Sequence, residues 1–139
     1  MLPLTGEMVL QDKNILIVED NVLLALDLSY VVADYGGRAI GPATTAAEAL
    51  RLLETEEIAA GVLDCHIADD EVTQIVMCLA EREIPVVITT ITAPPSLIAA
   101  LLPNAPILRA PIQSKLALAR LSGEVAKKVG GNPTSSLKS

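Results

Sequence analysis

Short, nearly unbroken apolar runs alternate along the chain with longer stretches whose apolar residues recur at helical spacing. Short apolar runs are typical of strands that are buried on both faces. Stretches with apolar residues at helical spacing are typical of helices that have one buried face. The apolar runs predict strands at residues 14–18, 38–41, 59–63, 86–89 and 107–109. The periodic stretches predict helices at residues 22–35, 46–54, 71–82, 96–102 and 113–129. Strands and helices are therefore expected to alternate through most of the sequence.

Turn and cap residues support these boundaries. Gly36 and Gly37 follow the first helix, where glycine readily ends a helix. Thr45 with Glu48 has the spacing of a capping box at the start of the second helix. Pro85 precedes the fourth strand, at a position that tolerates a missing N–H.

The alternation predicts an α/β fold with a doubly wound, five-stranded parallel sheet. Parallel strands need right-handed crossover helices, which then cover both faces of the sheet, and the strand order 2-1-3-4-5 is expected. A chain of 139 residues with 51% apolar residues fills one such domain and has no room for a second module. We place the domain at residues 13–129, after an N-terminal extension at 1–12. The Gly-, Ser- and Pro-rich tail at 130–139 is expected to be disordered.

Charge and cysteine content narrow the classes of partner and site. A net charge of −7 argues against nucleic acid as the main partner. No apolar stretch is long enough for a membrane span, and the N-terminus lacks the pattern of a secretory signal, so we expect a cytoplasmic protein with no membrane contact. Cys65 and Cys78 are expected to be reduced thiols, and with a single histidine no zinc site can be assembled.

Acidic residues follow two of the predicted strands. Glu19 and Asp20 come directly after the strand at 14–18, and Asp64 after the strand at 59–63. If these are neighbouring parallel strands, their carboxyl ends meet at the edge where open α/β sheets bind ligands. Carboxylates crowded together repel one another, and a hard cation with oxygen ligands relieves this repulsion. The pattern therefore predicts a Mg²⁺ site. Alternatively, Glu19 and Asp20 merely stabilise the N-terminus of the following helix.

Four motifs, in order and at the right spacing, resemble the receiver domain of two-component response regulators. Residues 14–21 resemble its first strand and acidic pair, residues 62–64 its phosphoacceptor strand, and residues 84–90 the strand that ends in a switch threonine. Residues 41–50 further resemble receivers that stand alone or serve sensor kinases in bacteria. The resemblance covers about residues 13–128 and implies the flavodoxin-like receiver fold.

The resemblance also implies roles for individual residues. Asp64 would take a phosphoryl group from a sensor histidine kinase or a phosphotransfer protein. Asp20 and Asp64 would bind Mg²⁺ directly, the backbone carbonyl of His66 would be a further ligand, and Glu19 would act through water. The hydroxyl of Thr90 would hydrogen-bond the phosphoryl group and draw its loop inward. On the residues alone, Thr89 and Thr92 offer equally available hydroxyls, and the His66 side chain is simply exposed.

The strand at 107–109 departs from the family pattern. Ala110 stands where receivers present a lysine that pairs with the phosphoryl group, so this cation is missing. Arg109 is adjacent, but strand alternation turns it away from the acidic residues. The usual aromatic residue is also absent, with Ile107 near its place. Pro111 is kept, and the resemblance makes a cis peptide bond between Ala110 and Pro111 an expectation.

Three readings remain open. The first is a single-domain response regulator in a phosphorelay, which accepts a phosphoryl group and signals to a downstream protein. Such a protein is not an enzyme, except that it catalyses its own phosphorylation and dephosphorylation. The second is a degenerate receiver that acts as a phosphorylation-independent interaction or dimerisation module. The third, an enzyme or flavin carrier, lacks a phosphate-binding loop and any GxGxxG motif.

A short apolar helix suggests where a partner binds. Four large apolar residues crowd the helix at 96–102, and so short a helix cannot turn all of them toward one core: Leu97, Ile98, Leu101 and Leu102. A partner or homodimer surface is therefore expected on this helix, the strand at 107–109 and the last helix. The alternative is that the segment packs irregularly and buries all four.

Overall fold

The structure is a computed structural model that describes residues 9–66, 72–92 and 95–138, with side chains described as far as residue 128. The strands are β1 (Asn14–Val18), β2 (Arg38–Ala43), β3 (Ala60–Asp64), β4 (Val86–Thr90) and β5 (Ile107–Arg109). The helices are α2 (Val22–Asp34), α3 (Ala46–Thr55), α4 (Val72–Glu81), α5 (Ser96–Leu101) and α6 (Ser114–Lys138). Every predicted strand and helix is present, with ends that differ by a few residues except at the end of α6.

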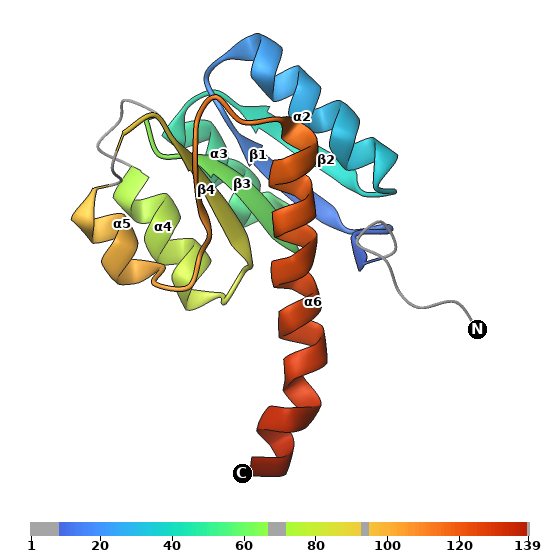
Figure 1. Cartoon of the computed structure of the whole chain (residues 1–139). Coiled ribbons are helices and arrows are strands. Elements are labelled where there is room, and N and C mark those ends of the chain that lie inside the picture. Colours follow the sequence, from blue (N-terminus) through green and yellow to red (C-terminus); the bar gives the residue numbers. More distant parts are fainter. Residues whose placement is uncertain (1–8, 67–71, 93–94, 139) are drawn as a thin grey trace.

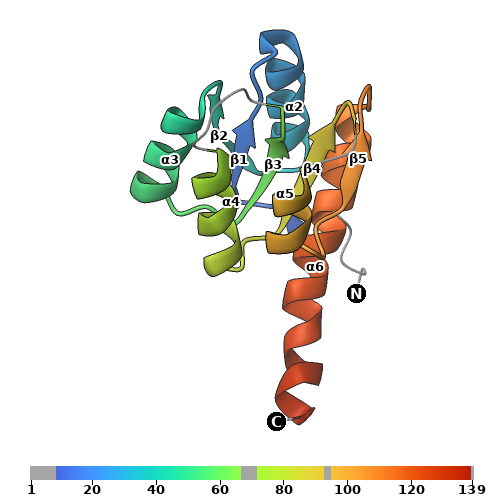
Figure 2. The ribbon, with the colours of Figure 1, turned by 90° about the vertical axis from the view of Figure 1, so that its left-hand side faces the viewer.

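The strands form one parallel sheet in the order β2-β1-β3-β4-β5, as predicted. Helices α2 and α6 cover one face of this sheet, and α3, α4 and α5 cover the other (Figures 1 and 2). The order reverses at β1, because β2 lies on one side of it and β3 on the other. The carboxyl ends of β1 and β3 are therefore neighbours at the point where this class of fold binds its ligands.

Alternating strand residues supply two separate cores. Leu16, Leu63 and Ile88 pack with α3, α4 and α5, whereas Val62 and Val87 pack with α2 and α6. Burial on both faces explains the unbroken apolar character of the central strands.

The second core reaches beyond the predicted domain start. Leu10 is fully buried in it, although residues 1–12 were expected to be an extension. At the other end, α6 continues to Lys138 and extends past the sheet, where the sequence predicts a disordered tail after Val129 (Figure 1). Gly130, Gly131 and Pro133 have low intrinsic helix propensity, so composition gave no signal for this extension. The domain boundaries stay predictions.

The capping box at α3 differs in one hydrogen bond from the predicted form. The Thr45 hydroxyl accepts from the Glu48 N–H at 3.2 Å, as expected. The Glu48 carboxylate, however, accepts from the N–H of Thr44 at 2.9 Å and not from that of Thr45. Both side chains of the box therefore accept a backbone N–H, but the N–H bonded to Glu48 belongs to the residue before the N-cap.

The two edge strands are short or irregular. The pairing of β2 with β1 shifts register between Leu16 and Val18, beside Gly41 and Pro42. Gly41 has φ +99°, and a Cβ there would lie 2.6 Å from the backbone nitrogen of Ala43, so only glycine fits. The opposite edge, β5, is three residues long.

Candidate functional site

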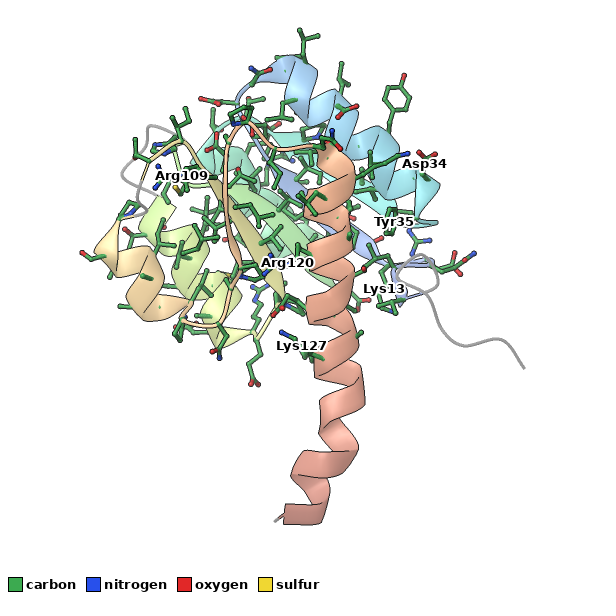
Figure 3. All side chains as sticks on the ribbon, viewed as in Figure 1. Lys13, Asp34, Tyr35, Arg109, Arg120 and Lys127 are labelled. Carbon is green, nitrogen blue, oxygen red and sulfur yellow. The ribbon has the colours of Figure 1, made fainter. Side chains whose placement is uncertain are left out.

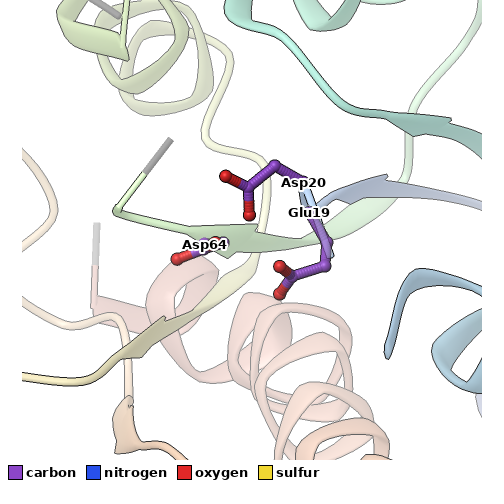
Figure 4. Close-up of side chains that lie close together, drawn as sticks. All are labelled: Glu19, Asp20 and Asp64. Carbon is purple, nitrogen blue, oxygen red and sulfur yellow. The ribbon is translucent and has the colours of Figure 1, made fainter. Parts of the chain in front are cut away.

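The end of β1 and the end of β3 bring three carboxylates together. Val18 pairs with Leu63, so Glu19 and Asp64 are the next residues on two adjacent strands, and Asp20 follows. One carboxylate oxygen from each of the three lies within 4.8 Å of the others. Figure 4 shows the three side chains grouped at this edge of the sheet. The structure thus confirms the proximity that the sequence predicts, while the roles of the residues stay predictions.

The acidic residues differ in burial and in hydrogen bonding. Glu19 is 4% exposed and Asp64 9%, whereas Asp20 is open to solvent. Glu19 accepts a hydrogen bond from the Asn21 N–H at 3.0 Å, and Asp64 Oδ1 accepts one from the His66 N–H at 2.9 Å. The cap of α2 is Asn21, whose side chain accepts from the Leu24 N–H at 3.1 Å. The helix-start alternative therefore stays open for Glu19 and Asp20, which directly precede this N-cap, and does not apply to Asp64.

Burial has a direct electrostatic effect on Glu19. Removal from water raises the pKa of its carboxyl from 4.5 to about 7, and the nearby charge of Asp64 adds to the rise, although the hydrogen bond from Asn21 opposes it. A cation bound among the three carboxylates would favour their ionised forms. Clustered carboxylate oxygens are also the ligand type that Mg²⁺ prefers, so the donor set fits this ion.

A histidine and a threonine are joined at the same edge of the sheet. Asp64 pairs with Thr89, which places Thr90 one residue beyond the pair. The Thr90 hydroxyl contacts His66 Nε2 at 2.8 Å and donates to the Thr92 carbonyl at 2.5 Å. Thr90 is 2% exposed, and His66 is exposed, as expected. The contact between them had no signal in the sequence, because they are 24 residues apart.

All these groups line one cavity of about 620 Å³. Its polar wall consists of the three acidic residues, Asn21, His66, Thr89 and Thr90, and Ala110 and Pro111 close one side. Leu24, Ile91 and Ile112 form an apolar rim. None of the described residues that line the cavity is a lysine or an arginine. The cavity therefore has an acidic interior with no basic side chain opposite it.

The end of β5 explains this lack of a cation. Ala110 lines the cavity, and its N–H donates to the Thr90 carbonyl at 2.6 Å. Arg109 is exposed and lies on the side of the sheet where α4 and α5 pack (Figure 3). Leu108 points into the opposite core with α2 and α6, so strand alternation turns Arg109 away, as predicted. The peptide bond between Ala110 and Pro111 is cis, which confirms that expectation.

Cys65 and Cys78 do not form a disulfide or a metal site among the described residues. Both are free thiols, as expected. Burial raises the pKa of the Cys65 thiol, and a hydrogen bond with Thr90 partly offsets the rise. A buried thiol with a raised pKa is a weak nucleophile, and Cys65 packs in the core under α3, α4 and α5.

Solved structures identify the fold. No family model matches the sequence, and no curated protein is significantly similar to it. A receiver domain protein from Methanospirillum hungatei JF-1 superposes with a TM-score of 0.75 at 20% identity, over 87% of this chain and 99% of that one. A response regulator from Burkholderia pseudomallei, solved with a phosphorylated aspartic acid, calcium and citrate, gives 0.68 at 21% identity, over 89% and 75%. The chain has the fold of a response regulator receiver domain.

A third structural neighbour is longer than this chain. The response regulator PhyR from Brucella abortus gives a TM-score of 0.71 at 25% identity, over 96% of this chain. The match spans 56% of the PhyR chain. In the part of the present chain that the structure describes, no helix has the length and apolar character needed to cross a bilayer.

Glu19 predicts a pH dependence of stability in metal-free buffer. Its pKa is higher in the folded chain, about 7, than the ordinary 4.5 expected after unfolding, so the folded state binds the proton more tightly. The free energy of unfolding should fall as pH rises from about 4.5 to 7 and then level off. We expect Glu19→Gln to be more stable than the unmodified chain at pH 8 by on the order of 2 kcal/mol, and the gain to vanish at pH 4. Urea unfolding in EDTA measures this, and a gain independent of pH would contradict it.

Proposed function

We propose that this chain is a single-domain response regulator receiver that accepts a phosphoryl group on Asp64. The observation that carries the proposal is the convergence of Asp64 with Glu19 and Asp20, beside Thr90, in one cavity of a receiver fold. The donor would be a phosphohistidine of a sensor histidine kinase or phosphotransfer protein, and the acceptor state would signal to a downstream protein in the cytoplasm. On this proposal the chain is not an enzyme beyond its own phosphorylation and dephosphorylation.

For this transfer the chain mainly has to position the reacting groups and neutralise their charge. A carboxylate oxygen of Asp64 attacks phosphorus, the bond from phosphorus to the histidine nitrogen breaks, and that nitrogen keeps the electron pair. The His66 N–H fixes the carboxylate by holding Oδ1 at 2.9 Å. The burial of Asp64 limits competition from water.

Mg²⁺ is the cation that this donor set fits. Asp20 and Asp64 would bind it directly, Glu19 would act through water, and the His66 carbonyl would supply a further oxygen. When bound, the ion neutralises charge on the phosphoryl oxygens. Glu19 would then be ionised, since the favourable charge offsets the burial that raises its pKa.

Acetyl phosphate tests the proposal directly. With Mg²⁺ present, intact-protein mass spectrometry should show the addition of one phosphoryl group, because Asp64 is positioned as the nucleophile. Asp64→Asn should abolish the adduct, and Asp20→Ala should lower its yield at least about tenfold by weakening the cation site. Asp27→Asn removes a carboxylate of α2 that bonds Ser114 outside the cavity, and should leave the yield unchanged. An adduct that persists in Asp64→Asn would exclude the assignment.

The missing cation should weaken the response to phosphate. A ligand shifts a conformational equilibrium only by its differential interaction with the two states, and Ala110 offers no charge to interact with the phosphoryl group. We expect Ala110→Lys to enlarge the NMR shift changes that beryllofluoride produces in residues 90–92. Arg109→Ala should have little effect, because Arg109 faces away. If Arg109→Ala abolishes a full rearrangement in the unmodified chain, the arginine supplies the cation.

A second candidate function is a phosphorylation-independent interaction module, favoured by Ala110 and by an exposed apolar surface. Of the four crowded residues on α5, Leu97 is 47% exposed, Ile98 is buried, and Leu101 and Leu102 are partly buried. Ile107 on β5 is 41% exposed. We propose that α5, β5 and α6 form a partner or homodimer surface through these side chains.

Sedimentation at high protein concentration tests this surface. The unmodified chain should self-associate and Leu97→Asp should be monomeric, because a buried carboxylate disfavours an apolar interface. Leu23→Asp is the matched control, since Leu23 is 80% exposed and lies on α2, which is not one of the three elements of this surface. If the unmodified chain is itself monomeric and Leu97→Asp still binds the kinase and the target, this surface is removed from consideration.

A further inference from the structure

His66 connects the phosphoacceptor to the switch hydroxyl through two different groups. Its backbone N–H donates to Asp64 Oδ1 at 2.9 Å. Its ring nitrogen Nε2 lies 2.8 Å from Thr90 Oγ1. One residue therefore contacts both the carboxylate that would be phosphorylated and the hydroxyl that would respond.

The hydrogen-bond partners fix where the protons lie. A hydroxyl has one proton, and a carbonyl oxygen can only accept. Because Thr90 Oγ1 bonds the Thr92 carbonyl at 2.5 Å, its proton is directed there. Thr90 must then accept from His66, so the ring carries its proton on Nε2.

This arrangement directs Thr90 away from Asp64. The hydroxyl's proton is used on the Thr92 carbonyl and a lone pair on the imidazole, and the Cys65 thiol is a further neighbour of the hydroxyl. No hydrogen bond joins Thr90 to Asp64 among the described residues. To donate to a phosphoryl oxygen on Asp64, Thr90 must give up the Thr92 carbonyl and draw Oγ1 away from the ring. Each resting bond therefore opposes the movement.

We propose that His66 is a positioning residue that restrains Thr90 in the resting site and limits its recruitment by a phosphorylated Asp64. The proposal rests on the proposed function for that recruitment, whereas the resting restraint itself is independent of phosphate. The ring acts through Thr90 and does not touch the reacting atoms. Its removal should therefore ease the switch.

The resting bond can be tested first in the metal-free full chain. His66 is the only histidine, so its ring nitrogens give unambiguous signals in a long-range proton–nitrogen NMR spectrum. We expect a proton on Nε2 that is hydrogen-bonded to Thr90. His66→Phe should increase the mobility of the Thr90 methyl group in relaxation measurements, and His66→Gln, which keeps a donor, should restore it. An Nε2 that carries no proton, or an unchanged Thr90 methyl group in His66→Phe, would overturn the restraint.

Beryllofluoride with Mg²⁺ then measures the effect on the switch. A hydrogen bond of ordinary net strength corresponds to about a 2- to 10-fold effect, so His66→Phe should bind the phosphoryl mimic more tightly by that factor. His66→Gln should bind as the unmodified chain does. In a Thr90→Val background, His66→Phe should have no effect, because the restrained hydroxyl is gone.

The outcomes separate the two proposals. Equal or weaker binding by His66→Phe, or the same gain in the Thr90→Val background, refutes His66 as a restraint while the phosphoacceptor assignment stands. If no variant binds beryllofluoride and acetyl phosphate leaves no adduct, the proposed function fails. The tautomer and the Thr90 methyl relaxation still decide whether His66 holds Thr90.

Discussion

The parallel pairing of β1 with β3 is the constraint on which the rest of the structure depends. Because Val18 lies opposite Leu63, the residues after each strand must share one edge of the sheet, and those residues are acidic. A slip by one residue would turn the core residues of either strand to the wrong face, so two buried cores maintain the register. Hydrophobic packing thus holds together carboxylates that repel one another. The repulsion is reduced where water reaches Asp20, and below about pH 7 where the raised pKa of Glu19 keeps its carboxyl protonated.

The cavity has acidic residues on one side and a neutral residue on the other. Its walls carry three carboxylates, while Ala110 occupies the side that faces them and Arg109 lies on the other face of the sheet. A phosphoryl group on Asp64 would lie between the proposed cation site and the neutral side chain of Ala110. Hydrogen bonds such as those of the Thr90 hydroxyl should then contribute a larger share of any conformational response.

The sequence predicted the features that follow from local pattern. Apolar runs, glycine pairs and crossover rules were sufficient for the strand order, and the acids after β1 and β3 for the cluster. The contact of His66 with Thr90 could not be predicted, because it depends on side-chain directions in two loops that are distant in sequence. The burial of Leu10 was missed because the apolar run at residues 8–10 is too short to show a periodicity. The helix after Val129 has no explanation in composition.

The edges of the sheet restrict how another chain could attach to it. At β2, Pro42 has no N–H to offer, and the neighbouring register shift disturbs the row of backbone groups. At β5, only three residues are extended, and Pro106 and Pro111 lie close on either side. A peptide that adds as a further strand needs a longer and more regular row of donors and acceptors. Strand addition, a common route to fibrous assembly as well as to peptide binding, is therefore disfavoured at both edges of this protein.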